Sequence, residues 1–196
     1  MIWNILSKFY DYFETIYNGK VYKGIGKEVA KNIISEDYVL ECACGTGSIT
    51  KYLAPNCKKI IATDFSDGML KQVHKKLVKF SNLEIYKADI NKLEYSDEIF
   101  DKVVAGNVIH LLDKPENALS ELMRVCKKGG MIIIPTYINL KQKFMPKLLT
   151  FIGVKFARQF NFESYKNFFI QLGYKNVEYT IVEGRMPCAI ALIKKN

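Results

Sequence analysis

Two acids stand where apolar runs of the sequence end, and their spacing is typical of a nucleoside site. Glu41 follows the apolar run 38–40 and precedes a turn that contains Gly45 and Gly47. The glycines let the backbone of that turn approach a ligand closely. Asp64 ends the next apolar run, 19 residues after Gly45 (64 − 45). An acid about 20 residues beyond such a turn binds the ribose hydroxyls of adenosine cofactors, so the sequence predicts a cofactor of this kind.

The spacing of the small residues separates two classes of adenosine cofactor. A dinucleotide fingerprint needs Gly-x-Gly-x-x-Gly. The sixth position counted from Gly45 is Thr50, and counted from Ala43 it is Ser48. The pattern acid-x-Gly-x-Gly-x-Gly does fit, with Ala43 in place of its first glycine. A nicotinamide dinucleotide is therefore disfavoured at this turn.

The segment 41–47 resembles the first motif of the class I S-adenosylmethionine-dependent methyltransferases, in particular the small-molecule enzymes of the ubiquinone/menaquinone-methyltransferase-like group. The resemblance implies that Glu41 holds the methionine end of S-adenosylmethionine and that Asp64 holds its ribose. It also implies that Asp89 accepts a hydrogen bond from the adenine amino group. Ala43 departs from the pattern, because its methyl group leaves less room for the cofactor. The implied cofactor-binding residues are Glu41, Ala43, Gly45, Gly47, Asp64, Phe65, Met69, Ala88, Asp89, Ile90 and Asn107.

Two further segments match the same family. The run 64–66 is followed by Met69 and Leu70, a frequent continuation in the family, where Met69 tends to lie near the adenine. The family pattern Lys-x-Gly-Gly before an apolar strand matches residues 127–134. An aspartate such as Asp89 is also favoured in turns for its local hydrogen bonds, and that structural interpretation stays open.

His110 is the histidine placed where a general base is wanted. It follows the fourth predicted strand, where the resemblance places the transferred methyl group. An imidazole with an ordinary pKa of ~6.5 accepts protons at neutral pH. Family members often carry a histidine here without using it as a base, so a structural role stays open. The resemblance implies that the aromatic N-terminal helix helps to form a substrate chamber, which makes Tyr10 and Tyr17 candidates for its wall, with plain core packing as the alternative.

The hydrophobic pattern predicts the elements that position these residues. Apolar residues at helical spacing predict an amphipathic helix over 5–18 and a second helix from about residue 22 or 26 to 34. Ser66 is a suitable N-cap for the helix that carries Met69. Strands are predicted over 38–41, 59–64, 83–87, 100–105, 131–134, 177–182 and 188–193, and further helices over 48–53, 66–80, 115–126 and 162–172.

This alternation of strands and helices predicts the α/β class. The resemblance implies a seven-stranded, doubly wound and mostly parallel sheet, the Rossmann-like methyltransferase fold, with a C-terminal antiparallel hairpin. We expect one domain over 1–196, because a chain of this length suits one core. Within it we expect an N-terminal helical cap (1–35), a cofactor-binding core (36–136), a substrate-recognition insert (137–160) and a C-terminal helix and hairpin (161–196).

The composition is that of a soluble globular chain, with 49% hydrophobic and 25% charged residues. No apolar run approaches the ~20 residues that span a bilayer, and the start of the sequence lacks a basic leader. We therefore expect a cytoplasmic protein without stable membrane insertion. The five cysteines are odd in number and irregularly spaced, which favours reduced thiols. The two histidines lack metal-ligand spacing, so no metal site is expected.

The formal charge of +9 raises the question of an anionic partner. Only Arg124, Arg158 and Arg185 are arginines, although bidentate contacts to bases and phosphates favour arginine. The lysines are spread along the whole chain. We therefore expect no specific nucleic-acid partner, with a weak attraction to anionic substrates or surfaces as the alternative. The basic and apolar segment 140–160 suits a pocket wall or a membrane surface equally.

The sequence thus predicts an enzyme that transfers a methyl group from S-adenosylmethionine to a small-molecule acceptor. The acceptor is apolar, lipid-like or anionic, and its identity and the oligomeric state stay open. One alternative is a protein that binds S-adenosylmethionine without catalysis. Another is an NAD(P)-dependent reductase, which the missing third glycine and the absence of a suitably placed Tyr-x-x-x-Lys pair disfavour.

Overall fold

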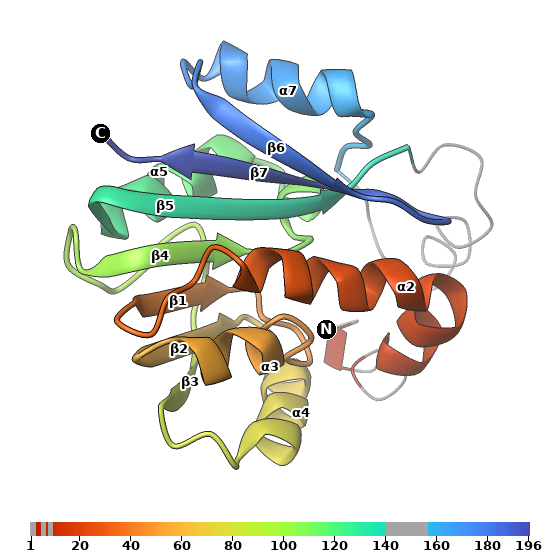
Figure 1. The fold of residues 1–196 in the computed structure, drawn as a ribbon, viewed down its shortest axis with the longest axis vertical. Coiled ribbons are helices and arrows are strands. Elements are labelled where there is room, and N and C mark those ends of the chain that lie inside the picture. Colours follow the sequence, from red (N-terminus) through yellow and green to blue (C-terminus); the bar gives the residue numbers. More distant parts are fainter. Residues whose placement is uncertain (1–2, 5–6, 8–9, 140–156) are drawn as a thin grey trace.

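The computed structural model describes residues 3–4, 7, 10–139 and 157–196, with only the backbone of Tyr10, Phe13 and Glu14. These residues build a seven-stranded sheet with helices against both faces (Figure 1). The strands are β1 (Tyr38–Cys42), β2 (Lys59–Asp64), β3 (Leu83–Lys87), β4 (Phe100–Ala105), β5 (Cys126–Tyr137), β6 (Val177–Val182) and β7 (Cys188–Lys194). The helices are α2 (Tyr10–Ala30), α3 (Thr50–Leu53), α4 (Asp67–Leu77), α5 (Pro115–Val125) and α7 (Phe162–Gln171), with 3-10 turns η1 (Ala54–Asn56) and η2 (Ile109–Leu111).

The sheet has the order β3-β2-β1-β4-β5-β7-β6, so the chain changes direction across the sheet between β1 and β4. β1 pairs in parallel with both neighbours, and Glu41 stands opposite Ala62 of β2 and Val104 of β4. Only β7 runs antiparallel, between β5 and β6. The predicted α/β fold with its C-terminal antiparallel hairpin is confirmed. Ligands bind outside the carboxyl ends of the strands at such a switch point.

Helices cover both faces of the sheet because each has one apolar side. α5 and α7 contribute Leu122 and Tyr165 to one buried cluster, whereas α2 and α3 contribute Ile25 and Leu53 to another. Figure 1 shows α2 and α3 in front of the sheet and α5 behind it. The N-cap of α4 is as predicted, since the Ser66 side chain accepts a hydrogen bond from the nitrogen of Met69.

The two helices predicted near the N-terminus are present as the two halves of α2, which meet at Asn18, and the second half ends at Ala30. α2 runs from Tyr10 to Ala30, and Asn18 within it has a non-helical backbone (φ −141°, ψ 29°). The Asn18 amide donates to the carbonyl of Met186 at 2.9 Å and accepts from its nitrogen at 3.2 Å. Both bonds reach the connection between β6 and β7, so the kink depends on contacts that local sequence does not reveal.

β5 begins earlier than predicted, at Cys126 directly after α5. Gly129 has φ 75° and donates to the carbonyl of Lys195 at 2.8 Å. The segment 127–130, which the prediction placed between the helix 115–126 and the strand 131–134, therefore belongs to β5 and forms an irregular stretch where the register with β4 shifts. The predicted insert 137–160 lies mostly outside the described residues. Its described ends meet in a parallel bridge between Ile138 and Phe160.

Candidate active site

A cavity of about 350 Å³ opens at the carboxyl ends of β1, β2 and β4. The predicted site residues that line it are Glu41, Ala43, Gly45, Asp64, Phe65, Met69, Ala88, Asp89, Ile90 and Asn107. These residues come from four separate connections of the chain, and the parallel register of the strands brings them together. The further lining residues are Trp3, Tyr22, Cys44, Thr46, Ser48, Ile49, Ser66, Asn91, Gly106, Val108, Leu111 and Leu112.

Glu41 brings a carboxylate to the cavity. The described residues do not satisfy all the hydrogen bonds that this carboxylate can accept. Its side chain is buried, and Oε2 has no hydrogen-bond partner among those residues. Burial raises the pKa of Glu41 to about 8, against the opposing effect of nearby Thr50. A buried carboxylate is costly unless it is paired. A ligand ammonium group would supply the missing partner, so this oxygen fits the methionine end of S-adenosylmethionine.

The turn after β1 uses left-handed backbone at three positions: Ala43 (φ 54°), Gly45 (φ 58°) and Gly47 (φ 84°). A Cβ atom at Gly45 would meet nothing within 4 Å, which leaves open space beside the backbone where a cofactor fits. At Gly47 a Cβ atom would approach Leu77 of α4 to 2.8 Å. Gly47 is thus required for packing and does not line the cavity. Ala43 adopts a conformation that favours glycine, at a cost of about 1–2 kcal/mol.

Asp64 connects the end of β2 to the turn and to the next helix. Its Oδ2 accepts from the backbone nitrogen of Gly45 at 2.9 Å, and its Oδ1 accepts from that of Ser66 at 2.8 Å. Burial raises the pKa of Asp64, and the backbone hydrogen bonds oppose that rise. An ionised carboxylate has about four lone-pair sites. Capacity therefore remains for the two ribose hydroxyls of a nucleoside.

The loop after β3 supplies the adenine side of the predicted site. Asp89 is exposed and accepts hydrogen bonds at 2.9 Å from both the backbone and the side-chain nitrogen of Asn91. Ile90 and Met69 are buried against the cavity, whereas Phe65 remains 55% exposed at its edge. The turn role and the ligand role of Asp89 are compatible, because both bonds from Asn91 use the same carboxylate oxygen.

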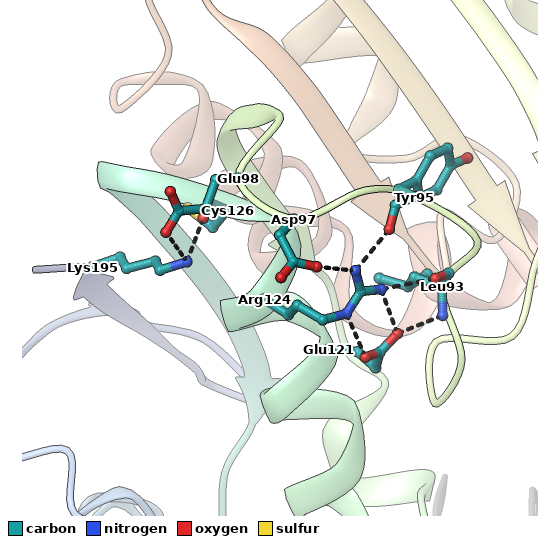
Figure 2. Close-up of polar contacts among 8 residues, drawn as sticks. All are labelled: Leu93, Tyr95, Asp97, Glu98, Glu121, Arg124, Cys126 and Lys195. Carbon is teal, nitrogen blue, oxygen red and sulfur yellow. Dashed lines mark hydrogen bonds and ion pairs between the residues drawn. The ribbon is translucent and has the colours of Figure 1, made fainter.

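Arg124 of α5 holds this loop in place (Figure 2). Its guanidinium donates to the carbonyls of Leu93 and Tyr95 and forms ion pairs with Glu121 and Asp97 at 2.8 and 2.7 Å. Glu121 in turn accepts from the backbone nitrogen of Leu93 at 2.8 Å. A planar guanidinium suits several fixed acceptors at once. The loop that carries Asp89 is therefore anchored to α5.

The connection after β4 forms the remaining wall. Asn107 has φ 54°, and its backbone nitrogen donates to the carbonyl of Pro135 at 2.8 Å. Val108, Leu111 and Leu112 present apolar surface to the cavity. Beyond Asn107, this wall offers van der Waals contacts, which suits an apolar reactant.

His110 lies behind that wall and does not line the cavity. It is 4% exposed, and its Nδ1 lies 2.9 Å from Oγ1 of Thr136. Burial lowers the pKa of His110 to about 4, so the imidazole is neutral at physiological pH. Its contact with Thr136 joins η2 to β5.

The predicted aromatic residues of the cap have different surroundings. The side chain of Tyr10 lies outside the described residues. Tyr17 packs beside the buried cluster of α2, with the guanidinium of Arg185 5.0 Å from its ring centre, and it does not line the cavity. Trp3 and Tyr22 line the cavity from the N-terminal region instead.

Several lining residues were missed by the sequence prediction. Thr46 and Ser48 lie within the recognised turn, and their hydroxyl groups were the available signal. Tyr22 lay in the second predicted helix, where its aromatic side chain resembled ordinary core packing. Trp3, which is the single tryptophan of the chain, lies in a segment with no motif.

No group of three or more metal-ligating side chains occurs in the part of the chain that the structure describes. The five cysteines, all described, are buried and unbridged. No helix within 3–4, 7, 10–139 or 157–196 has the length and apolar character needed to cross a bilayer.

The sequence and the fold are similar to those of known methyltransferases. The model of a family described as methyltransferase domain matches residues 40–134, from β1 to β5. A demethylmenaquinone methyltransferase of Clavibacter sepedonicus is 34% identical over 101 residues, which cover 52% of this chain and 41% of that protein. This chain therefore spans less than half the length of that relative.

Other relatives match over most of their length. A demethylmenaquinone methyltransferase of Staphylococcus carnosus is 28% identical over 201 residues, which cover 88% of this chain and 83% of that protein. Among solved structures, a SAM-dependent methyltransferase of Thermotoga maritima has a TM-score of 0.71 at 21% identity, with all of both chains covered. This likeness shows that the two chains share a fold.

Proposed function

The chain belongs to the class I S-adenosylmethionine-dependent methyltransferases of the ubiquinone/menaquinone-methyltransferase-like group, and we propose that it methylates a small, largely apolar acceptor. S-adenosylmethionine is its cofactor. Because both sequence relatives described above are named demethylmenaquinone methyltransferases, a reduced quinone ring is the first acceptor class to test.

One observation carries the proposal: a single cavity combines an unpaired buried carboxylate with an apolar wall. Oε2 of Glu41 has no partner among the described residues and suits the cofactor's ammonium group. Val108 and Leu111 line the same cavity with apolar atoms. A polar acceptor would lose its hydration at such a wall without gaining hydrogen bonds. An apolar ring gains contact area there without that loss.

The residues of the chain contribute mainly position and water exclusion. When bound, S-adenosylmethionine supplies a methyl group already activated by the sulfonium. Glu41 would hold the methionine portion of the cofactor, and Asp64 would hold its ribose. Together they would fix the direction in which the methyl group points. The apolar wall around Leu111 excludes water from the reacting atoms. We assign no general base, because His110 lies behind that wall.

Methyl transfer from radiolabelled S-adenosylmethionine tests the proposal. We expect label in a short-chain demethylmenaquinol and in other apolar phenols, and little in hydrophilic amines or thiols. The Glu41→Gln variant is the control, since it keeps the size of the side chain but loses its charge. Label that appears only in hydrophilic acceptors would contradict the apolar assignment, and binding without label in any acceptor would favour a non-catalytic protein.

The proposal also covers the cellular location of the protein and its binding partners. We propose that the protein acts in the cytoplasm on a small molecule, without a specific nucleic-acid partner. The sequence supports this view, because the lysines are spread along the whole chain and only three arginines accompany them. Nucleic-acid binding that persists at ~200 mM salt would contradict it.

A further inference from the structure

We propose that Asp11 is a positioning residue for the cofactor cavity, acting through Thr46 and Tyr22. The proposal rests on the cofactor site described above. Asp11 itself does not line that cavity. It stands at the start of α2, and no sequence motif marked it.

Asp11 receives three donors from three parts of the fold. Its Oδ1 accepts from the hydroxyl of Tyr22 at 2.7 Å and from the hydroxyl of Thr46 in the glycine turn. Its Oδ2 accepts from the ammonium group of Lys76 on α4. One carboxylate thus joins the N-terminal helix, the cofactor turn and the helix after β2.

The side chains that Asp11 contacts separate two cavities. Tyr22, Thr46 and Ser48 line the cofactor cavity, and the same three residues line a second cavity of about 580 Å³ on their other side. Asp11 and Lys76 line that second cavity. Tyr22 and Thr46 are buried, with 7% and 3% of their surface exposed. A buried hydroxyl needs a hydrogen-bond partner inside the protein. Oδ1 of Asp11 is the acceptor for both hydroxyls and so fixes their direction.

The charge on Asp11 is maintained by its surroundings. Burial raises the pKa of Asp11, but the hydrogen bonds from Lys76 and Thr46, with that from Tyr22, outweigh this effect and leave the pKa below its usual value. Lys51 of α3 also faces the second cavity and interacts electrostatically with Asp11. An ionised acceptor makes stronger hydrogen bonds than a neutral one. The carboxylate is thus suited to orient two hydroxyl groups.

The alternative role is an ordinary anchor between α2 and α4, in which only the ion pair with Lys76 matters. The two roles differ in what each partner contributes. If Asp11 acts through the hydroxyls, removing Lys76 leaves the wall intact. If it is an anchor, removing Lys76 has the same effect as removing Asp11.

Cofactor affinity tests the proposal without any methyl acceptor. Trp3 lines the cavity and is the single tryptophan, so its fluorescence reports binding of S-adenosylmethionine and of its demethylated product, with calorimetry as a second measurement. We expect Asp11→Ala to weaken binding of both ligands at least tenfold. Lys76→Met leaves the bonds from Tyr22 and Thr46 in place and should weaken binding much less than Asp11→Ala does. Glu28→Ala, which removes an exposed ion pair with Lys31 on the same helix, is the matched control and should bind as the parent does.

A double-mutant cycle tests whether Asp11 acts on cofactor affinity through Thr46. Thr46→Val should weaken binding, and adding it to Asp11→Ala should cost little more, because both changes remove the same hydrogen bond. Should Asp11→Ala fail to fold, Asp11→Asn replaces it in the cycle. Parent-like affinity in the Asp11 variant, additive losses in the cycle, or an equal loss in Lys76→Met would each overturn the proposal. If the parent binds S-adenosylmethionine but transfers no methyl group, the proposed function is wrong, whereas the proposal for Asp11 is unaffected.

Discussion

The carboxylate of Asp64 accepts a hydrogen bond at 2.9 Å from the backbone nitrogen of Gly45, which joins the end of β2 to the turn after β1. The sequence interval between these residues suggested that both serve one ligand, and the structure shows that they also bond to each other. The second oxygen of Asp64 holds Ser66, the N-cap of α4. The residue therefore shapes the cavity in addition to facing it.

Replacing Asp64 should damage cofactor binding more than stability. Hydrogen bonds to a charged group are worth about 1.5–3 kcal/mol each, so Asp64→Ala should weaken S-adenosylmethionine binding at least tenfold. The backbone nitrogens of Gly45 and Ser66 lose their acceptor as well, so the melting temperature should also fall. Calorimetry and thermal unfolding measure the two effects. Asp67→Asn, which removes an exposed ion pair with Lys87, should leave affinity unchanged, and wild-type affinity in Asp64→Ala would refute the assignment of the ribose site.

Glu41 should make cofactor binding depend on pH. Its pKa is raised to about 8 by burial, so at neutral pH the cofactor-free side chain is largely protonated. Pairing with an ammonium group requires the charged form, and binding then releases a proton. Affinity should rise by up to tenfold per pH unit between about pH 6 and 7.5, where the cofactor's amino group is still charged.

Calorimetry in two buffers of different ionisation enthalpy measures this released proton directly. Glu41→Gln should bind more weakly and without the pH dependence. The same raised pKa stabilises the cofactor-free fold below pH ~4.5, and that stability is lost as the pH rises through about 8. Glu41→Gln should therefore unfold less readily than the parent at pH 8.5. A pH-independent affinity in the parent would show that Glu41 is not buried and protonated.

The sequence predicted those parts of the fold that depend on local pattern. Short apolar or alternating runs located β1 to β4, β6 and β7 to within a residue. Continuous apolar residues mark the parallel strands buried on both faces, such as β2. Ser66 identified the start of α4, since a hydroxyl before an apolar periodic segment is a local capping signal. Motif spacing likewise identified Glu41 and Asp64 as residues at strand ends, where the parallel register puts them on one cavity.

Features set by distant contacts were not predicted. The first predicted helix ends at Asn18, where α2 is broken, but the bonds that hold this break reach Met186, 168 residues away in sequence, and local pattern did not reveal them. Asp11 lies within the helix predicted over 5–18 and belongs to no motif, and its contact with Thr46 requires the complete fold. The burial of His110 behind the wall follows from how η2 packs against β5, whereas its sequence position favoured exposure to the cavity.

The two glycines of the turn should respond differently to alanine. Both have left-handed backbone, which costs a residue with a side chain about 1–2 kcal/mol. At Gly47 the added methyl group would also press against Leu77 at 2.8 Å, and such overpacking adds about 1–3 kcal/mol. Gly47→Ala should therefore lose more unfolding free energy than Gly45→Ala. Gly45→Ala, whose methyl group meets open space beside the cavity, should instead lose cofactor affinity.

Chemical denaturation and calorimetry on both variants separate these effects. Equal losses of stability would mean that Gly47 does not pack on α4 as described. Unchanged affinity in Gly45→Ala would place the cofactor away from this turn. The comparison is matched, because both substitutions add the same methyl group to the same type of backbone.

His110 should remain neutral during catalysis. Its pKa is lowered to about 4 by burial, so its contribution to stability is present above the unfolded pKa of ~6.5 and is lost as the pH falls toward 4. Between pH 7 and pH 5 the parent should lose about 2 kcal/mol of unfolding free energy through this residue, at 1.36 kcal/mol per pKa unit. His110→Gln cannot titrate and should lack that loss. Nuclear magnetic resonance of the two histidines, with His74→Gln to assign the signals, measures the pKa itself. If His110 were a working base, its signal would titrate above pH 6, and the acidic limb of the rate profile would disappear in His110→Gln.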